Sequence, residues 1–175
     1  LLTWSGFDLM DYNHPLNFNT IGVYGHRSSN FIVQNCDLLI TIGCRLDTRT
    51  TGSRVNTFAR DATIISVDLD KNELNKNRGL KIKHKIFQDA GAFITNILKS
   101  KTKYKAKIEW LNYCNILKKE LPIEKESSFE GKYTEIYGFM NDLSTVLDNK
   151  SVIIPDDGGH LTWTMQGFKI KKGQR

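Results

Sequence analysis

The chain has 175 residues, of which 39% are hydrophobic and 25% charged, and its mean hydropathy is −0.39. This length suffices for one substantial core, or for one domain and part of a second, and no apolar run is long enough to span a membrane. With only 13 Gly and 3 Pro, the composition also excludes collagen-like and low-complexity chains. Residues 1–4 are typical of the inside of a strand, so we expect the chain to be an excised piece of a longer protein.

Cysteine usage and charge distribution narrow the class further. Cys36, Cys44 and Cys114 are widely spaced and odd in number, which argues against a disulfide framework or a zinc site and favours a reducing, cytoplasmic compartment. The net charge of +6 arises within residues 69–107, which hold 11 basic and 3 acidic residues. Lysines alternating with other residues from Lys99 to Lys107 are typical of a solvated linker, so we expect no nucleic-acid partner.

The first hundred residues alternate strands with helices, which predicts a Rossmann-like α/β domain with a parallel sheet flanked by helices. Continuous apolar, β-branched runs suit strands that are buried on both faces. In chain order we predict a helix at 28–37, strands at Leu38–Ile42 and 63–67, a weaker strand near an edge at Ile82–Phe87, and a helix at 89–99 with Asp89 as its N-cap.

The second half begins with a predicted linker at 101–131, which contains a helix at 108–121 ended by Pro122. A second α/β pattern follows, with a helix at 133–147, a strand at 151–155, a turn at 156–160 and a helix from 161. One such unit cannot bury its own faces. We therefore predict a nucleotide-binding-like domain at 1–100 and an incomplete second α/β domain at 132–175.

Polar residues follow the predicted strands at their carboxyl ends, where open parallel sheets bind ligands. After the first strand, Gly43 lets a backbone approach a ligand closely, and Arg45 and Arg49 could clamp a phosphate. Asp68 follows the next strand, at a distance where an acidic group often meets a ribose hydroxyl. No G-x-G-x-x-G motif is present. The pattern predicts a nucleotide site, and the alternative is that Arg45, Asp47 and Arg49 only form ion pairs within the loop.

Two glycine-containing turns precede predicted helices. The turn at 22–25 suits an anion or a flat ring that lies on backbone N–H groups. Gly158 and Gly159 leave N–H groups free to meet a diphosphate, and His160 could add a hydrogen bond. Each of these is also a common turn pattern. The spacing of the His and Cys residues predicts neither a metal site nor a nucleophilic catalytic group.

Several segments together carry a family likeness. They are T-W-S-G at 3–6, H-P at 14–15, G-V-Y-G at 22–25, Asn30, Q-N-C-D-L-L-I at 34–40, G-C-R-L-D-T-R-T-T-G at 43–52, V-D-L-D at 67–70 and E-L-N-K-N at 73–77. Their order and spacing resemble the central domain of thiamine-diphosphate enzymes of the acetolactate synthase (acetohydroxyacid synthase) large-subunit type. The segment at 151–166 resembles the start of their diphosphate-binding domain.

The resemblance implies a six-stranded parallel sheet flanked by helices, which in acetolactate synthases holds FAD without using it for redox turnover. The positions that match the flavin site are Val23, Tyr24, Gly43, Cys44, Arg45, Asp47, Arg49, Asp68, Asp89 and Ala90. Gly158, Gly159 and His160 match the stretch that touches the phosphates of thiamine diphosphate.

The reaction implied by the resemblance is decarboxylation of pyruvate, followed by transfer of the resulting hydroxyethyl group to a second 2-oxo acid. The resemblance also implies a homodimer or homotetramer. The catalytic glutamate and the Mg²⁺ ligands of such enzymes match nothing in residues 1–175, so we expect this segment alone to be inactive. Tyr24 replaces a His, Leu46 and Thr48 replace Phe and Asp, and Gly159 replaces Gln of the family pattern. These differences leave open whether the central domain binds FAD, ADP or no nucleotide. Two alternatives remain: a related enzyme whose central domain is a scaffold, and a freestanding nucleotide-binding module.

Overall fold

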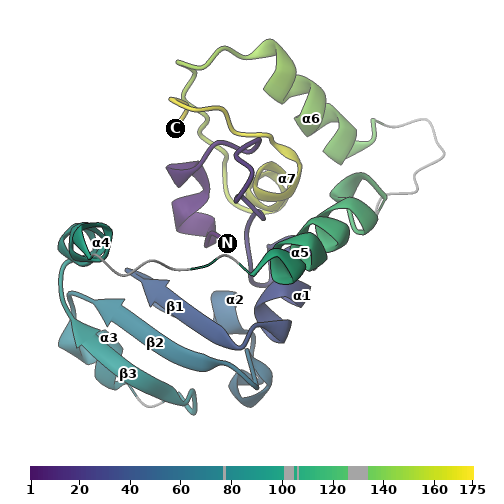
Figure 1. Ribbon diagram of the computed structural model, residues 1–175. Coiled ribbons are helices and arrows are strands. Elements are labelled where there is room, and N and C mark those ends of the chain that lie inside the picture. The colour runs from purple at the N-terminus through teal and green to yellow at the C-terminus, as the bar shows by residue number, and fades with distance from the viewer. Residues whose placement is uncertain (77, 101–104, 106, 126–133) are drawn as a thin grey trace. The chain divides into compact units, whose positions relative to one another are not determined.

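Three parallel strands form one sheet in the computed structural model, which describes residues 1–76, 78–100, 105, 107–125 and 134–175 (Figure 1). The strands are β1 (Leu38–Ile42), β2 (Thr63–Asp68) and β3 (Ile82–Phe87), and their spatial order is β1-β2-β3. The predicted parallel α/β sheet with flanking helices is confirmed. β3 lies at an end of this three-strand order, where the sequence predicted an edge strand.

The chain divides into two compact units, which we describe separately. The sheet unit is Ile32–Leu111, and the helical unit combines Leu1–Phe31 with Asn112–Arg175. Two helices cross these limits, α1 (Arg27–Asn35) and α5 (Ile108–Glu120). The predicted domain limits at residues 100 and 131 stay predictions.

The core of the sheet unit lies along β2. Val67 is fully buried and Ile64 is nearly so, as the continuous apolar run of this strand predicts. The strand between them also carries Ser66, whose hydroxyl accepts a hydrogen bond of 3.1 Å from Thr41 of β1. β2 pairs in parallel with β1 on one side and with β3 on the other. The loops that follow the three strands therefore leave the sheet at the same edge.

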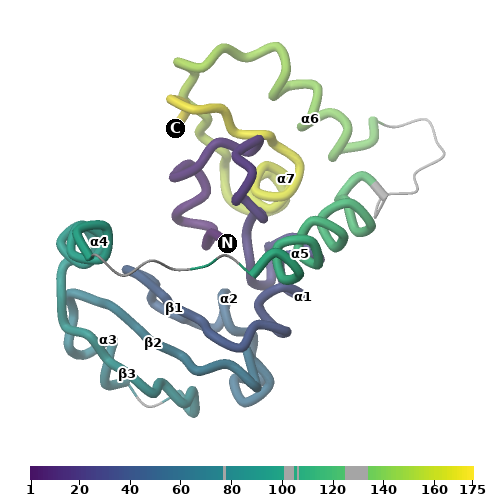
Figure 2. The backbone as a smooth tube through the Cα atoms, in the orientation of Figure 1, coloured from purple at the N-terminus to yellow at the C-terminus, as the bar shows by residue number. Residues whose placement is uncertain are grey.

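Short helices connect the strands. Between β1 and β2 lie α2 (Thr48–Thr51) and the 3-10 helix η2 (Val55–Thr57), and this path can be followed in Figure 2. Helix α3 (Lys71–Asn75) follows β2 and contacts β2 and β3. Helix α4 (Ala90–Lys99) follows β3 and contacts β2. The connections from β1 to β2 and from β2 to β3 each return the chain to start a parallel neighbour, which is the βαβ arrangement that the alternating pattern predicts.

Asp89 caps α4, as predicted, because its carboxylate accepts a 2.8 Å hydrogen bond from the backbone N–H of Ala92. We expect Asp89→Ala to lower the free energy of unfolding by about 1 kcal/mol, since the first turn loses an acceptor for its N–H groups. Urea denaturation checks this, with Asp61→Ala as the control because Asp61 is an exposed turn residue. Equal losses in the two variants would contradict a capping role.

The helical unit contains η1 (Trp4–Leu9), η3 (Ile123–Lys125), α6 (Ile136–Val146) and α7 (Gly159–Gly167). Helices α6 and α7 approach closely at Gly167, where an added Cβ would lie 2.9 Å from the Cβ of Met140. Near this point Tyr137 donates a hydrogen bond of 2.9 Å to the side chain of Gln166. Phe168 and Ile170 are buried in the same unit.

Two predicted strands are wrong. Residues 1–4 form an isolated parallel bridge, Leu2 with Thr20, before the chain turns into η1. Residues 151–155 are extended but not a strand, because in the described part of this unit no strand pairs with them. Their backbone N–H groups donate from Ile153 to the carbonyl of Arg175 at 2.6 Å and from Ser151 to the carbonyl of Asp148 at 3.4 Å. Ile154 is 87% exposed, so the apolar composition of this segment is not matched by burial here.

Helix limits differ slightly from the predicted ones. The helix expected at 28–37 is Arg27–Asn35, and the one expected at 108–121 is Ile108–Glu120. The helix expected at 133–147 is Ile136–Val146, and Tyr133 lies outside the described residues. The last helix begins at Gly159 and not at 161, so Gly159 and His160 lie in its first turn. Residues 101–104, 106 and 126–131 of the predicted linker are also outside the described part of the chain. Within the part described, no helix is long and apolar enough to cross a membrane.

Candidate functional site

The loop after β1 begins at Gly43, which has φ +58° and donates its N–H to the carbonyl of Val67 at 2.9 Å. An added Cβ at Gly43 would lie 3.9 Å from the Cβ of Ala90. The first turn of α4 is therefore close to the start of this loop. This is the juxtaposition expected at the carboxyl ends of the strands of one parallel sheet.

Asp47 organises the middle of the loop as the N-cap of α2. Its carboxylate accepts hydrogen bonds from the N–H of Thr50 at 3.0 Å and from the Thr50 hydroxyl at 3.1 Å. Burial acts to raise the pKa of Asp47, but these bonds and the nearby Arg78 prevail and hold the pKa below its usual value. Asp47 is therefore a structural anion of the loop, already engaged with protein donors.

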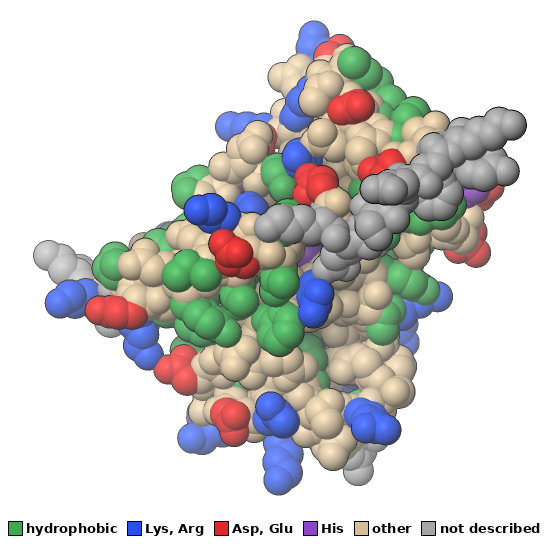
Figure 3. All heavy atoms as spheres, turned by 90° about the vertical axis from the view of Figure 1, so that its right-hand side faces the viewer, with side chains coloured by type: hydrophobic (Ala, Val, Ile, Leu, Met, Phe, Trp, Pro, Cys, Tyr) green, Lys and Arg blue, Asp and Glu red, His purple; other side chains and the backbone are tan. Residues whose placement is uncertain are grey.

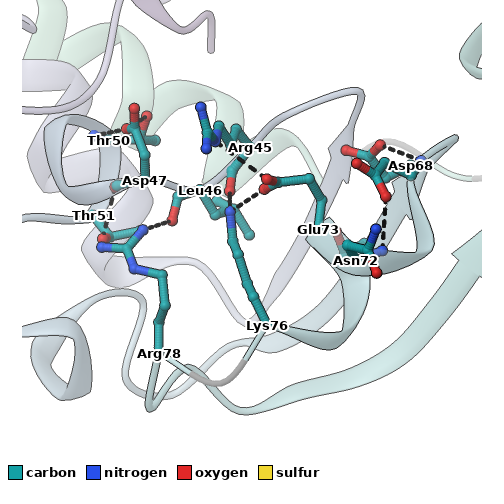
Figure 4. Close-up of polar contacts among 12 residues, drawn as sticks. Arg45, Leu46, Asp47, Thr50, Thr51, Asp68, Asn72, Glu73, Lys76 and Arg78 are labelled. Carbon is teal, nitrogen blue, oxygen red and sulfur yellow. Dashed lines mark hydrogen bonds and ion pairs between the residues drawn. The ribbon is translucent and has the colours of Figure 1, made fainter.

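Arg45 is an exposed cation of the loop. Its side chain is 74% exposed, and its Nε lies 3.2 Å from a carboxylate oxygen of Glu73 in α3 (Figure 4). The same carboxylate pairs with Lys76. Arg45 forms an ion pair, but its partner Glu73 lies outside the loop, so the alternative of pairing within the loop is wrong for Arg45. An exposed pair of this kind has a small interaction energy, so it can exchange for a stronger anion.

The other end residues come together at the same edge of the sheet. Asp68 accepts a 2.9 Å hydrogen bond from the N–H of Asp70, and its carbonyl accepts one of 3.1 Å from Gln88. Asp89 and Ala90 follow Gln88 directly. The sheet unit therefore unites eight of the predicted positions: Gly43, Cys44, Arg45, Asp47, Arg49, Asp68, Asp89 and Ala90.

A cavity of about 20 Å³ is lined by Cys44, Arg45, Asp68 and Glu73, among others. That volume holds about one water molecule, so no flavin or adenine ring is enclosed there. Burial raises the pKa of the Cys44 thiol, which keeps it neutral near pH 7. A nucleotide at this edge would lie across the exposed side of the loop, where Arg45 is.

Val23 and Tyr24 belong to the helical unit, in a turn closed by the bond from Gly25 N–H to Gly22 C=O at 3.0 Å. The side chain of Asn30 in α1 holds Gly22 at two points, accepting from its N–H at 2.9 Å and donating to its carbonyl at 3.0 Å. Val23 is 57% exposed at the tip. The turn therefore presents backbone and an apolar side chain outward on a rigid base.

Gly158, Gly159 and His160 form the start of α7 in the helical unit. Gly158 has φ +87°, and an added Cβ there would meet open space, so the backbone is accessible. The ring of His160 packs edge-on against Trp163, with centroids 5.8 Å apart. The N–H of Gly158 donates to the carboxylate of Asp157 at 2.8 Å, and the Trp163 ring lies so close to Gly159 that an added Cβ would be 2.7 Å from it. The helix start is therefore open at Gly158 and covered by Trp163 at Gly159.

Sequence reasoning missed the roles of Glu73, Lys76 and Arg78, which contact the loop from the chain around α3. The pair Glu73–Lys76 has helical i, i+3 spacing after the N-cap Asp70, a local signal that was available. No local signal links Arg78 to Leu46.

On the face drawn in Figure 3, Lys and Arg are interspersed with Asp and Glu. Among the described residues no group of three or more His, Cys, Asp or Glu could hold a metal ion.

Comparisons of the sequence with known proteins match the chain to one family. The family model described as "Thiamine pyrophosphate enzyme, central domain" matches residues 1–97. The chain is 29% identical over 171 residues to the acetolactate synthase isozyme 1 large subunit of Escherichia coli (strain K12), covering 98% of this chain and 29% of that protein. It is 34% identical over 168 residues to the probable acetolactate synthase large subunit of Methanocaldococcus jannaschii, covering 91% and 27%. The chain thus spans less than a third of the length of these curated relatives.

Proposed function

Because the chain belongs to the thiamine pyrophosphate enzyme family and contains its central domain, we propose that it is part of a carboligase or decarboxylase acting on 2-oxo acids. The specific reaction we propose is that of an acetolactate synthase, with pyruvate as first substrate and a second 2-oxo acid as acceptor. The single observation that carries this proposal is the similarity to acetolactate synthase large subunits along 98% of the chain. Since those proteins are more than three times as long, the activity would belong to a longer protein, and residues 1–175 alone are expected to be inactive.

The start of α7 is the proposed diphosphate contact. Gly158 has a positive φ, an added Cβ there would meet open space, and the helix dipole favours negative charge at this end. Its N–H donates to the carboxylate of Asp157 at 2.8 Å, so a phosphate oxygen would replace that carboxylate as the acceptor. His160, exposed in the first turn, would donate a hydrogen bond to a phosphate oxygen. When bound, thiamine diphosphate supplies the electron sink for decarboxylation. We propose that the Mg²⁺ ligands lie outside this segment, in the longer protein.

The loop of the sheet unit is the proposed site for FAD or ADP. Arg45 is exposed and presented by a loop that is ordered at Asp47, and Asp68 and Ala90 lie at the same edge. Arg45 and Arg49 would meet phosphate oxygens, and Asp68 a ribose hydroxyl. Val23 and Tyr24 are proposed to lie along the flavin. We further propose a homodimer or homotetramer in the cytoplasm, a compartment that keeps thiols reduced.

A second candidate is a related thiamine-diphosphate enzyme whose central domain is a scaffold. The ion pair between Arg45 and Glu73 favours this candidate, because it gives the guanidinium group of Arg45 a partner within the protein, so that no nucleotide phosphate is needed. The two candidates differ in whether a nucleotide binds.

The catalytic proposal is tested with the full-length protein supplied with thiamine diphosphate and Mg²⁺. Incubation with pyruvate should release CO₂ and form acetolactate, as followed by mass spectrometry of the products. Formation of acetolactate would support the proposal. CO₂ release with a different product would move the protein to another 2-oxo acid enzyme. No consumption of pyruvate, in a folded protein that binds thiamine diphosphate, would contradict the proposed substrate.

Arg45→Ala is expected to weaken FAD or ADP binding by about 1.5–3 kcal/mol, which is roughly ten- to hundredfold in Kd, because one charge-assisted contact is lost. The measurement is calorimetric titration of the full-length protein with each nucleotide. Arg60→Ala removes an exposed arginine outside the proposed site and serves as the matched control. Wild-type protein that binds neither nucleotide would favour the scaffold candidate. Unchanged affinity in Arg45→Ala would show that this residue only pairs with Glu73.

A further inference from the structure

Lys76 and Arg78 reach from the chain after α3 to backbone carbonyls of the loop at 43–52 (Figure 4). The ammonium group of Lys76 donates to the carbonyl oxygen of Arg45. The guanidinium group of Arg78 donates to the carbonyl oxygen of Leu46 and, at 3.1 Å, to the hydroxyl of Thr48. Two cations are thus bonded to consecutive peptide carbonyls that lie about thirty residues away in sequence.

These carbonyls belong to the most constrained part of the loop. Leu46 has φ +50°, a left-handed conformation that a leucine rarely adopts, and its side chain is 5% exposed. Such a conformation persists only where the surroundings fix it from several sides. Here the apolar side chain is buried while Arg78 holds the carbonyl of Leu46 itself. The bond from Lys76 fixes the peptide immediately before it.

The cations around the loop therefore have different surroundings. Lys76 is 27% exposed and bonded to the carbonyl of Arg45 and to Glu73, whereas the side chain of Arg45 is 74% exposed. Glu73 contacts both, so one carboxylate anchors Lys76 and orients the exposed guanidinium. Lys76 holds the backbone at Arg45, and the conformation of this backbone determines where the exposed guanidinium group of Arg45 points.

We infer that Lys76 and Arg78 are positioning residues for the nucleotide site, because they hold the backbone at Arg45 and Leu46 in the conformation that presents Arg45 to a nucleotide phosphate. The inference rests on the proposed FAD or ADP site and extends it to two residues that would not touch the ligand. It differs from a plain surface ion pair, whose loss has little effect, because the acceptors are peptide carbonyls of a strained segment.

The first experiment reads the loop without any ligand, by hydrogen–deuterium exchange of the full-length protein. The N–H groups of Thr51 and Gly52 donate to Asp47 and Thr48, so they report on the order of α2. In Lys76→Met and in Arg78→Met we expect these amides to exchange roughly tenfold faster, since each variant loses a charge-assisted bond. Lys83→Met, which removes an exposed lysine from β3, is the matched control and should exchange as wild type. Unchanged exchange in both variants overturns the inference.

The second experiment measures Kd for FAD and for ADP in the same proteins. Lys76→Met and Arg78→Met should each weaken binding roughly tenfold or more, Lys83→Met should not, and Lys76→Arg should recover affinity because it keeps a donor. If Arg45→Ala loses binding but Lys76→Met and Arg78→Met keep it, the proposed site stands and the positioning role is overturned. If exchange accelerates but wild type binds neither nucleotide, the proposed site fails, and the two cations stabilise the loop without serving a nucleotide.

Discussion

Gly25→Ala is expected to lower the free energy of unfolding of the helical unit by about 3 kcal/mol or more. A Cβ at this position would lie 2.4 Å from the carbonyl carbon of Ile21 and 2.5 Å from the carbonyl oxygen of Thr20. Both atoms are backbone, so no side-chain rotation relieves the clash. The turn itself would have to open, which breaks the bond from Gly25 N–H to Gly22 C=O.

The measurement is urea denaturation followed by tryptophan fluorescence, because Trp4 and Trp163 both lie in the helical unit. Gly91→Ala is the matched control. An added Cβ there meets only the carboxylate of Asp89, at 3.2 Å, and the helical position favours alanine. A loss at Gly25→Ala no larger than that at Gly91→Ala would show that the turn adapts readily.

The protein is expected to lose about 3 kcal/mol of stability between pH 6.5 and pH 4 through His26 alone. Burial lowers the pKa of His26 from 6.5 to about 4 in the folded protein. Above pH 6.5 the imidazole is neutral in both states and the stability is fully present. As the pH falls, the unfolded chain binds a proton that the folded protein does not, so unfolding becomes more favourable until about pH 4, where both states are protonated.

His26 is held in place by Thr20, whose carbonyl accepts the His26 N–H at 2.8 Å and whose hydroxyl lies 3.3 Å from Nδ1. His26→Gln keeps a polar side chain there but removes the titration. The free energy of unfolding should therefore fall less steeply between pH 6.5 and 4 in His26→Gln than in wild type. Equal slopes in wild type and His26→Gln would contradict this assignment.

Local patterns predicted the sheet unit well. The strands β1 and β3 have the limits that the sequence indicated, and Asp89 caps α4 as expected. These features depend on neighbours within a few residues, where periodicity and capping are informative. The extended segment at 151–155 shows where such reasoning fails, because a strand is defined by its pairing partner and not by its own composition.

The candidate site was predictable in part for the same reason. The carboxyl-end rule placed Gly43 and Asp68 at one edge of the sheet, because parallel strands end together. The bonds from Lys76 and Arg78 to the carbonyls of the loop were not predictable. They depend on the left-handed conformation of Leu46, which exposes its carbonyl to a distant side chain, and a leucine carries no sequence signal for that conformation.

The strand order of the sheet has a consequence for how the protein is made. Each strand pairs with the strand next to it in the chain, so β1 and β2 can associate before β3 has been synthesised. At about 5–20 residues per second, the ribosome delivers the next strand within a few seconds. β2 then protects one edge of β1 while its own second edge waits for β3, and short closing distances favour that pairing over association with another nascent chain. Sequential pairing thus limits the time during which an open sheet edge could start aggregation.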